Sequence, residues 1–252
     1  MTLQFYSDLT WPEIEKLDRN KTCAIIPMGA IEQHGSHMFV DTDARVSIEL
    51  SKHIGARIDS FDWLVLPPLY YGYAKASEVF PGTLSINGLT LSLLVKDILS
   101  GILRQSFQRI VILNSNYENV EFIGDSASDV LERFPQARLC IIQWWEFISD
   151  EAIHDIFGAD WHGWGNEHAG IMETSLMLHC NEQRVRLEGA QRNATDTGHK
   201  FRFRLLPYDR KHFSPGGATV RPNACSSERG KRLLEEFLSG FEKLVQEEFS
   251  AA

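Results

Sequence analysis

The chain has 252 residues, of which 43% are hydrophobic and 23% charged, and its formal net charge is −9 at pH 7. This length suits one domain that buries a substantial core, and the composition is that of an ordinary globular protein. The acidic balance disfavours nucleic acid and anionic membranes as partners, because neither is attracted to a negatively charged surface.

The expected compartment follows from the N-terminal segment and the cysteines. Residues 1–8 have neither the basic start nor the apolar stretch of a secretion signal, and no apolar run is long enough to span a bilayer. The cysteines are scattered without a C-x-x-C pair, which favours buried thiols over a disulfide framework. We therefore expect a cytoplasmic protein without a membrane partner.

The first predicted elements are a short helix and a buried strand. Thr10 can cap the helix, and Pro12 stands where a first helical turn tolerates proline. The apolar run Cys23–Ile26 predicts the strand, which leads directly into a loop rich in Glu, His and Asp. A buried strand that feeds such a loop is how an α/β protein presents metal ligands at a sheet edge.

This loop, Pro27–Asp43, contains Glu-x-His-x-x-His followed by Asp-x-Asp. In an extended segment Glu32 and His34 point to the same side, and Asp43 can return across the loop to meet them. Clusters of this kind favour a metal site. The alternative is a solvated polar loop with an incidental histidine.

The elements that follow alternate between helices and strands. The apolar runs are continuous, as in strands buried on both faces, so we predict a single α/β domain over residues 1–252 with a mostly parallel sheet. The predicted strands are Leu64–Leu66, Ile110–Leu113 and Arg138–Ile142, and the predicted helices are Ala44–Ile54, Thr90–Gln105 and Glu118–Phe134.

Two strand ends carry further candidate groups. Asn116 and Glu118 follow the strand Ile110–Leu113, at the position where parallel sheets place ligands and acid–base groups. Asn114 and Ser115 can equally be turn and capping residues. Trp145 follows the next strand, where its indole could line the same pocket.

The last third of the chain is less regular. Glu167 and His168 are predicted at the start of a helix that runs to His179, after glycines and tryptophans that could form a flap over a flat substrate. Residues 188–227 suggest loops and short strands, including a half-exposed strand at Lys200–Arg204. An amphipathic packing helix is predicted at Ser227–Phe249.

Taken together, these motifs resemble the creatininase (creatinine amidohydrolase) family, and the likeness runs nearly from end to end, closest to the creatininase-like members. The resemblance implies a three-layer α/β/α fold with a mostly parallel central sheet, and hydrolysis of cyclic or linear amides with usually two divalent ions. It rests on residues 27–35 with Asp43, on Phe80–Thr83, on Asn114–Asn119, and on Gly163, Trp164, Glu167–Gly170 and Glu173–Ser175.

The resemblance also implies roles for individual residues. By position, Glu32 would bind the first ion and His34 the second, with Asp43 bridging the two. Glu118 would be a carboxylate on the second ion and a catalytic acid–base group, and His168 would shuttle the proton. The substrate-binding set would be Tyr117, Trp145, Trp164 and Glu167, with Glu173 in a supporting role.

Two departures from the family pattern stand out. Creatininases have Asn-Gly-His where this chain has Asn114-Ser115-Asn116, and that His is a ligand of the first ion. An amide oxygen from Asn116 is a poor ligand for zinc but an acceptable one for manganese or magnesium. The loop Tyr71–Val79 is also shorter and brings Lys75 and Glu78 near the expected mouth, which argues against creatinine itself as the substrate.

The leading functional hypothesis is therefore a metal-dependent amidohydrolase that opens an amide, cyclic in the first instance, by attack of a metal-bound hydroxide. Zinc is the first expectation, with manganese or magnesium at a weaker second site. The resemblance implies a homo-oligomer, a hexamer, acting on a small molecule. The alternatives are a metal-depleted, non-catalytic binding protein of this fold and a metal-dependent hydrolase of a lactone or cyclic ketone.

Overall fold

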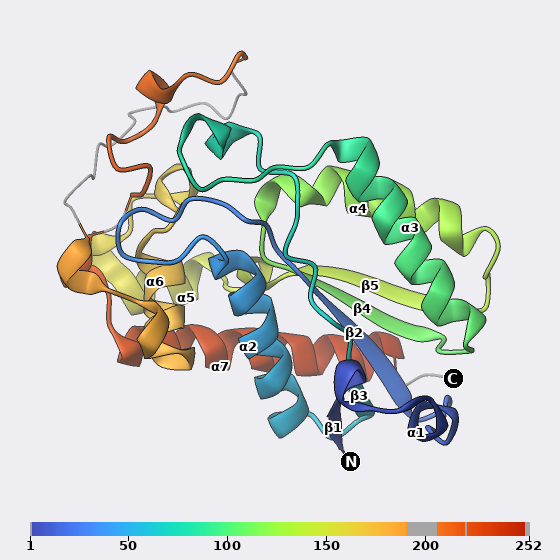
Figure 1. Cartoon of the computed structure of the whole chain (residues 1–252). Coiled ribbons are helices and arrows are strands. Elements are labelled where there is room, and N and C mark those ends of the chain that lie inside the picture. Colours follow the sequence, from blue (N-terminus) through green and yellow to red (C-terminus); the bar gives the residue numbers. More distant parts are fainter. Residues whose placement is uncertain (1, 191–205, 220, 250–252) are drawn as a thin grey trace.

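The computed structural model describes residues 2–190, 206–219 and 221–249, and Figure 1 shows its arrangement. Its centre is a five-stranded sheet in the order β1-β3-β2-β4-β5, and all four pairings are parallel. The strands are β1 (Leu3–Phe5), β2 (Thr22–Met28), β3 (Asp62–Val65), β4 (Arg109–Asn114) and β5 (Arg138–Gln143).

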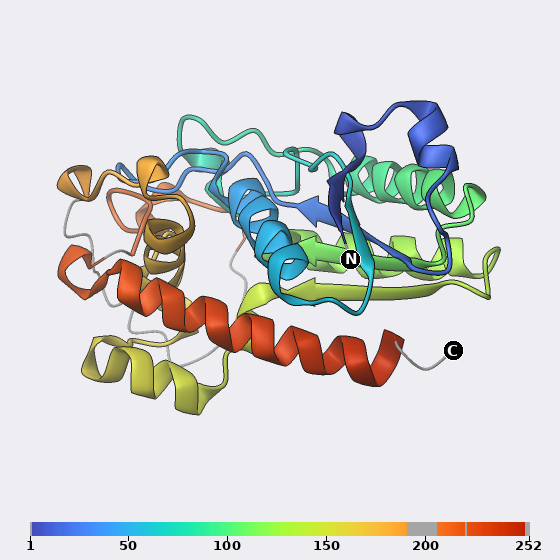
Figure 2. The ribbon, with the colours of Figure 1, turned by 90° about the horizontal axis from the view of Figure 1, so that it is seen from below.

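Helices cover both faces of the sheet, so the three-layer prediction is confirmed (Figure 2). One apolar core lies between the sheet and α3 and α4, and a second lies between the sheet and α2, α5, α6 and α7. The helices are α1 (Trp11–Glu15), α2 (Thr42–Arg57), α3 (Gly88–Arg104), α4 (Val120–Leu131), α5 (Asp150–Phe157), α6 (Ile171–Cys180) and α7 (Ser227–Leu244), and a π-helical turn, Val245–Phe249, extends α7. Residues buried on both sides explain why the central strands appear in the sequence as unbroken apolar runs.

Several predicted elements differ from those observed. The helix predicted from Glu118 divides into a 3-10 turn, Tyr117–Asn119, and α4. The helix predicted from His168 begins only at Ile171. The described parts of 188–227 form turns rather than short strands, and the strand predicted at Lys200–Arg204 lies outside the described residues. No helix in the described part of the chain is both long and apolar enough to cross a membrane.

The carboxyl ends of three neighbouring strands lie side by side. Met28 of β2 pairs with Asn114 of β4, which in turn pairs with Gln143 of β5. Directly after β2, a Cβ on Gly29 would lie 2.2 Å from the backbone nitrogen of Ala44, so only glycine permits this approach. The start of α2, with Asp43, is thereby held against the loop that follows β2.

Candidate metal centre

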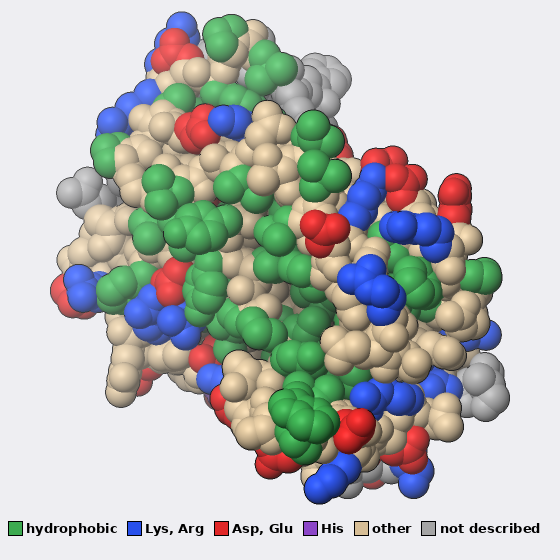
Figure 3. All heavy atoms as spheres, turned by 45° about the vertical axis from the view of Figure 1, so that its right-hand side comes forward, with side chains coloured by type: hydrophobic (Ala, Val, Ile, Leu, Met, Phe, Trp, Pro, Cys, Tyr) green, Lys and Arg blue, Asp and Glu red, His purple; other side chains and the backbone are tan. Residues whose placement is uncertain are grey.

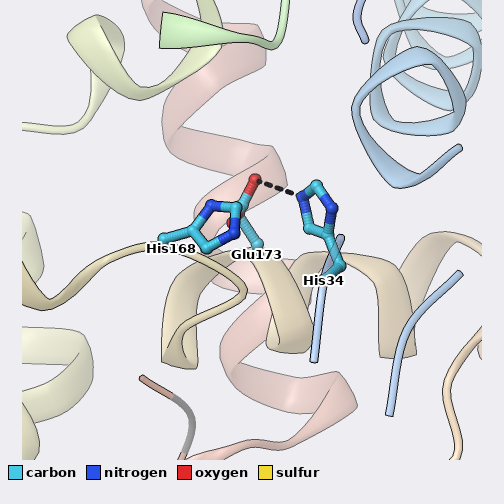
Figure 4. Close-up of side chains that lie close together, drawn as sticks. All are labelled: His34, His168 and Glu173. Carbon is cyan, nitrogen blue, oxygen red and sulfur yellow. Dashed lines mark ion pairs between the residues drawn. The ribbon is translucent and has the colours of Figure 1, made fainter. Parts of the chain in front are cut away.

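Two segments that are distant in the sequence meet at this edge of the sheet. The loop after β2 carries Glu32 and His34, the loop before α6 carries His168, and α6 itself carries Glu173. Figure 4 shows the side chains of His34, His168 and Glu173 turned toward one another. Each offers a ligand atom within 4.8 Å of the others, and no other group of three His, Cys, Asp or Glu residues in the described chain does so.

The imidazole of His34 is oriented as a metal ligand would be. Its Nδ1 lies 3.0 Å from the carbonyl oxygen of Glu32 and donates to it, so in the neutral imidazole Nε2 carries the lone pair. Nε2 is 3.0 Å from Asp43 Oδ1 and 3.9 Å from Glu173 Oε1. The contact with Asp43 lacks hydrogen-bond geometry, so this buried nitrogen has no hydrogen-bond partner among the described residues.

The charges around His34 favour a cation. Burial alone lowers the pKa of His34, but Asp43 and Glu173 outweigh it and raise that pKa well above its ordinary value. Burial raises the pKa of Asp43 to about 6, although His34 opposes the shift. Burial also raises the pKa of Glu173, but His34 overrides that effect and the net shift is downward. A divalent ion fits this donor set of imidazole and carboxylate, which is typical of zinc and manganese sites.

His168 has a partner for either protonation state. Its Nε2 lies 2.9 Å from the carbonyl oxygen of Gln33 and 2.8 Å from Gln33 Nε2. The Gln33 amide is fixed because Nε2 also donates to the Gly217 carbonyl and Oε1 accepts from the Gly35 N–H. A protonated His168 Nε2 can donate to the carbonyl, and a deprotonated one can accept from the amide. Such a side chain is suited to moving a proton.

Asn116 differs from its predicted role. The sequence predicts an amide oxygen directed at an ion, whereas the structure directs the amide nitrogen at Glu32 Oε2, 2.8 Å away, and at Asp43 Oδ2, 3.1 Å away. The oxygen accepts from the backbone N–H of Asn119 at 3.1 Å, as the cap of the turn Tyr117–Asn119. A capping residue must turn its oxygen to the helix start, and this turns its nitrogen to the carboxylates.

Two neighbours of Asn116 lie outside the group of three potential ligands. Glu118 is half-buried, and its Oε2 accepts from the backbone N–H of Ala76 at 3.1 Å. The Tyr117 side chain is 69% exposed, so in this chain alone it lies at the surface. The sequence places both residues near the site by motif position, but that position does not fix how far each side chain reaches.

The predicted tryptophans and Glu167 have the following partners in the described chain. Trp145 packs edge-on against Trp144, and Trp164 packs edge-on against Trp161 at 5.2 Å between ring centroids. Glu167, predicted as a substrate contact, accepts the backbone N–H groups of Met172 and Glu173 at the start of α6. Burial raises the pKa of the Glu167 carboxyl to about 8.

Two contributors were not predicted from the sequence. Gln33 lies between Glu32 and His34, and strict alternation would turn it away from them, but the loop is not a regular strand and its amide reaches His168. Ser77 donates its hydroxyl to Glu32 Oε1 at 2.5 Å from a 3-10 turn, Ala76–Val79, in a distant loop. Only the position of Gln33 inside the motif offered a sequence signal.

Comparison with known proteins gives a consistent result. The family model described as "Creatininase: Creatinine amidohydrolase" matches residues 7–245. The creatinine amidohydrolase of Pseudomonas putida is 31% identical over 257 residues, covering 97% of each chain. A mycofactocin precursor peptide peptidase of Mycobacterium ulcerans is 26% identical, covering 91% of this chain and 82% of its own.

Solved structures agree with these sequence matches. A mutant creatininase complexed with creatine superposes with a TM-score of 0.87 at 30% identity, covering 97% of this chain and 98% of the other. A mutant creatininase of the Zn–Zn type gives the same TM-score and coverage. A creatininase whose name specifies Mn gives 0.86 at 31% identity, again covering 97% and 98%.

Proposed function

The chain belongs to the creatininase family, and from this membership and the geometry around His34 we propose that it is a divalent-metal-dependent hydrolase of C–N bonds. The observation that carries the proposal is the buried His34 Nε2, which lacks a hydrogen-bond partner in the described chain and faces the carboxylates of Asp43 and Glu173. We assign the ion to His34, with Asp43 and Glu173 as the nearest carboxylates. Zinc is the first choice and manganese the second, in keeping with the names of the similar structures.

A divalent ion bound here would polarise the scissile carbonyl and lower the pKa of a bound water toward about 7. His168 would then carry the proton to the leaving nitrogen, because its Nε2 is held between the carbonyl and the amide of Gln33. A positioned acid–base group of this kind contributes roughly a hundred- to ten-thousand-fold to the rate. Glu118 is proposed as the second acid–base group on the basis of its motif position.

We infer that the substrate is a small cyclic amide rather than a peptide. The match to the Pseudomonas putida enzyme spans 97% of both chains, whereas 82% of the peptidase is covered. Trp145, Trp164 and Tyr117 would contact the flat face of such a substrate. Lys75 and Glu78 form an ion pair, 2.7 Å apart, in the loop Tyr71–Val79. These charged side chains near the expected entrance of the substrate site argue against creatinine itself as the substrate.

A homo-oligomer in the cytoplasm remains our expectation. Apolar side chains gather over a broad part of one face of the molecule (Figure 3), and large exposed apolar residues include Leu89, Leu93 and Tyr117. Patches of this kind mark interaction surfaces in many proteins. A hexamer would match the family, and sedimentation velocity would measure the assembly.

The test is metal-dependent activity on a panel of cyclic amides, with lactones as the comparison class. Wild-type protein loaded with zinc or manganese should hydrolyse at least one cyclic amide. The rate of His34→Ala on the same substrate should be lower by at least about a hundredfold. His154→Ala removes an exposed histidine on α5 and serves as the matched control. Activity on lactones alone, or equal activity of His34→Ala, would overturn the proposal.

A further inference from the structure

Two carboxylates that the family pattern assigns to one ion are joined here by the side chain of Asn116. One amide nitrogen donates to both Glu32 Oε2 and Asp43 Oδ2, at 2.8 and 3.1 Å. All three residues are buried: Asn116 is 4% exposed, Glu32 is 7% exposed and Asp43 is 2% exposed. The amide therefore lies where a cation bridging these carboxylates would lie.

The orientation of this amide is fixed by its other end. Asn116 Oδ1 accepts the backbone N–H of Asn119, and a backbone N–H can only donate. The atom that faces Asn119 must therefore be the oxygen, and the nitrogen must face the carboxylates. A carboxamide nitrogen carries two donor hydrogens and accepts nothing, so it cannot ligate a metal ion.

The second oxygen of Glu32 is also occupied, because Ser77 donates its hydroxyl to Oε1. Buried carboxylates need donors or cations to offset their desolvation, and Glu32 obtains donors on both oxygens. His34 Nε2 presents the opposite case, because it is buried and has no hydrogen-bond partner in the described chain. The two halves of the centre thus differ: one is closed by hydrogen bonds and the other is open to an ion.

Building on the function proposed above, we propose that this chain binds one divalent ion, at His34, and that Asn116 replaces the second ion of the Zn–Zn creatininase. Its amide nitrogen donates a hydrogen bond to each of the Glu32 and Asp43 carboxylates, at the place where a cation would otherwise bridge them. Glu32 then acts as a positioning residue, with its Oε1 3.7 Å from His168 Nε2. Within the set of first-ion ligands that the resemblance implies, the departure is the side chain of Asn116.

The test counts ions. Metal-free full-length protein is equilibrated with zinc chloride, and the zinc bound per chain is measured by plasma mass spectrometry and native mass spectrometry. Wild type should hold one zinc per chain, and Asn116→His should hold two, because an imidazole supplies the missing ligand. Asn20→His introduces a histidine at an exposed position and should remain at one.

Asn116→Asp is the second variant, since it has nearly the same shape and decides the question should Asn116→His fail to fold. A third carboxylate beside Glu32 and Asp43 should also raise the count to two. Two zinc ions in wild type, or one in both Asn116 variants, would overturn this inference and leave the proposed function standing. No zinc in wild type would overturn the proposed function itself.

Discussion

At the scale of single residues, the backbone beside His168 adopts an uncommon conformation. Ala169 has a φ of +48°, in the left-handed region that residues with a side chain seldom occupy, and it is fully buried. This conformation lets its N–H donate to Glu173 Oε2 at 2.8 Å, which orients the carboxylate toward His34. Strain of this kind is retained where the surrounding structure requires it.

Substitution at Ala169 tests this requirement. Ala169→Val should lower the free energy of unfolding by roughly 1–3 kcal/mol, because a β-branched residue is poorly tolerated at positive φ. Ala169→Gly should stay within about 1 kcal/mol of wild type, since relief of strain offsets the lost methyl contact. Urea unfolding followed by circular dichroism measures both variants. Equal stability of the valine and glycine variants would show that the positive φ is not required.

Residue types and motif positions were enough to propose a site but not its connections. The cluster Glu32, His34, Asp43 could be recognised because Glu, His and Asp follow a buried strand within a few residues. The direction of the Asn116 amide could not be predicted, since it depends on a cap at Asn119 and on carboxylates from two other segments. Contacts between distant segments leave no local pattern.

At the scale of secondary-structure elements, the approach of α2 to the end of β2 positions Asp43. A Cβ on Gly29 would lie within 3 Å of three backbone atoms of Asp43 and Ala44. Ser47, one turn further along α2, donates to the carbonyl of Met28 at 2.7 Å and fixes the same contact. The distance between Asp43 and His34 thus depends on a residue without a side chain.

Gly29→Ala should therefore lower both stability and zinc affinity. The added methyl must displace the start of α2, so we expect a loss of at least about 2 kcal/mol in the free energy of unfolding. Gly124→Ala is the matched control: its Cβ would meet nothing within 4 Å, and alanine favours the middle of α4 by up to about 1 kcal/mol. Thermal unfolding with and without zinc separates the two effects. An unchanged zinc affinity in Gly29→Ala would contradict this account of Asp43.

The predictability of the elements follows their burial. The central strands β2 and β4 were predicted because their residues are apolar on both faces. β1 was missed because it has three half-buried residues at the sheet edge, and its pairing with β3 depends on a segment some 60 residues away. The late start of α6 follows from Gly170 and the positive φ of Ala169, which the helical pattern of apolar residues does not reveal.

At the scale of the whole molecule, the packing of the layers determines the pKa and the reactivity of the cysteine thiols. Burial raises the thiol pKa of Cys140 to about 11 and those of Cys180 and Cys225 to about 12, and Cys23 is fully buried with a raised pKa as well. The described cysteines are all free thiols. Because the thiolate is the reactive form, the folded protein should protect them.

At pH 8 the native protein should therefore react with iodoacetamide much more slowly than the denatured chain, with mass spectrometry counting the modified sites. In the folded state the thiols stay protonated above pH 9, whereas in the unfolded chain they lose their protons near the ordinary pKa of about 9. The free energy of unfolding should therefore fall as the pH rises from 9 toward 12. Urea unfolding at pH 8 and pH 10 measures this decrease. A cysteine alkylated as fast in the native protein as in urea would contradict the packing described.

The proposed hydrolase function depends on whether His34 binds a cation, and anomalous scattering at the zinc edge from crystals grown with zinc shows this directly. We predict one peak per chain, about 2.0–2.1 Å from His34 Nε2, with a carboxylate oxygen of Asp43 or Glu173 as a further ligand. A centre without a peak at His34, in crystals where zinc is present elsewhere, would contradict the account.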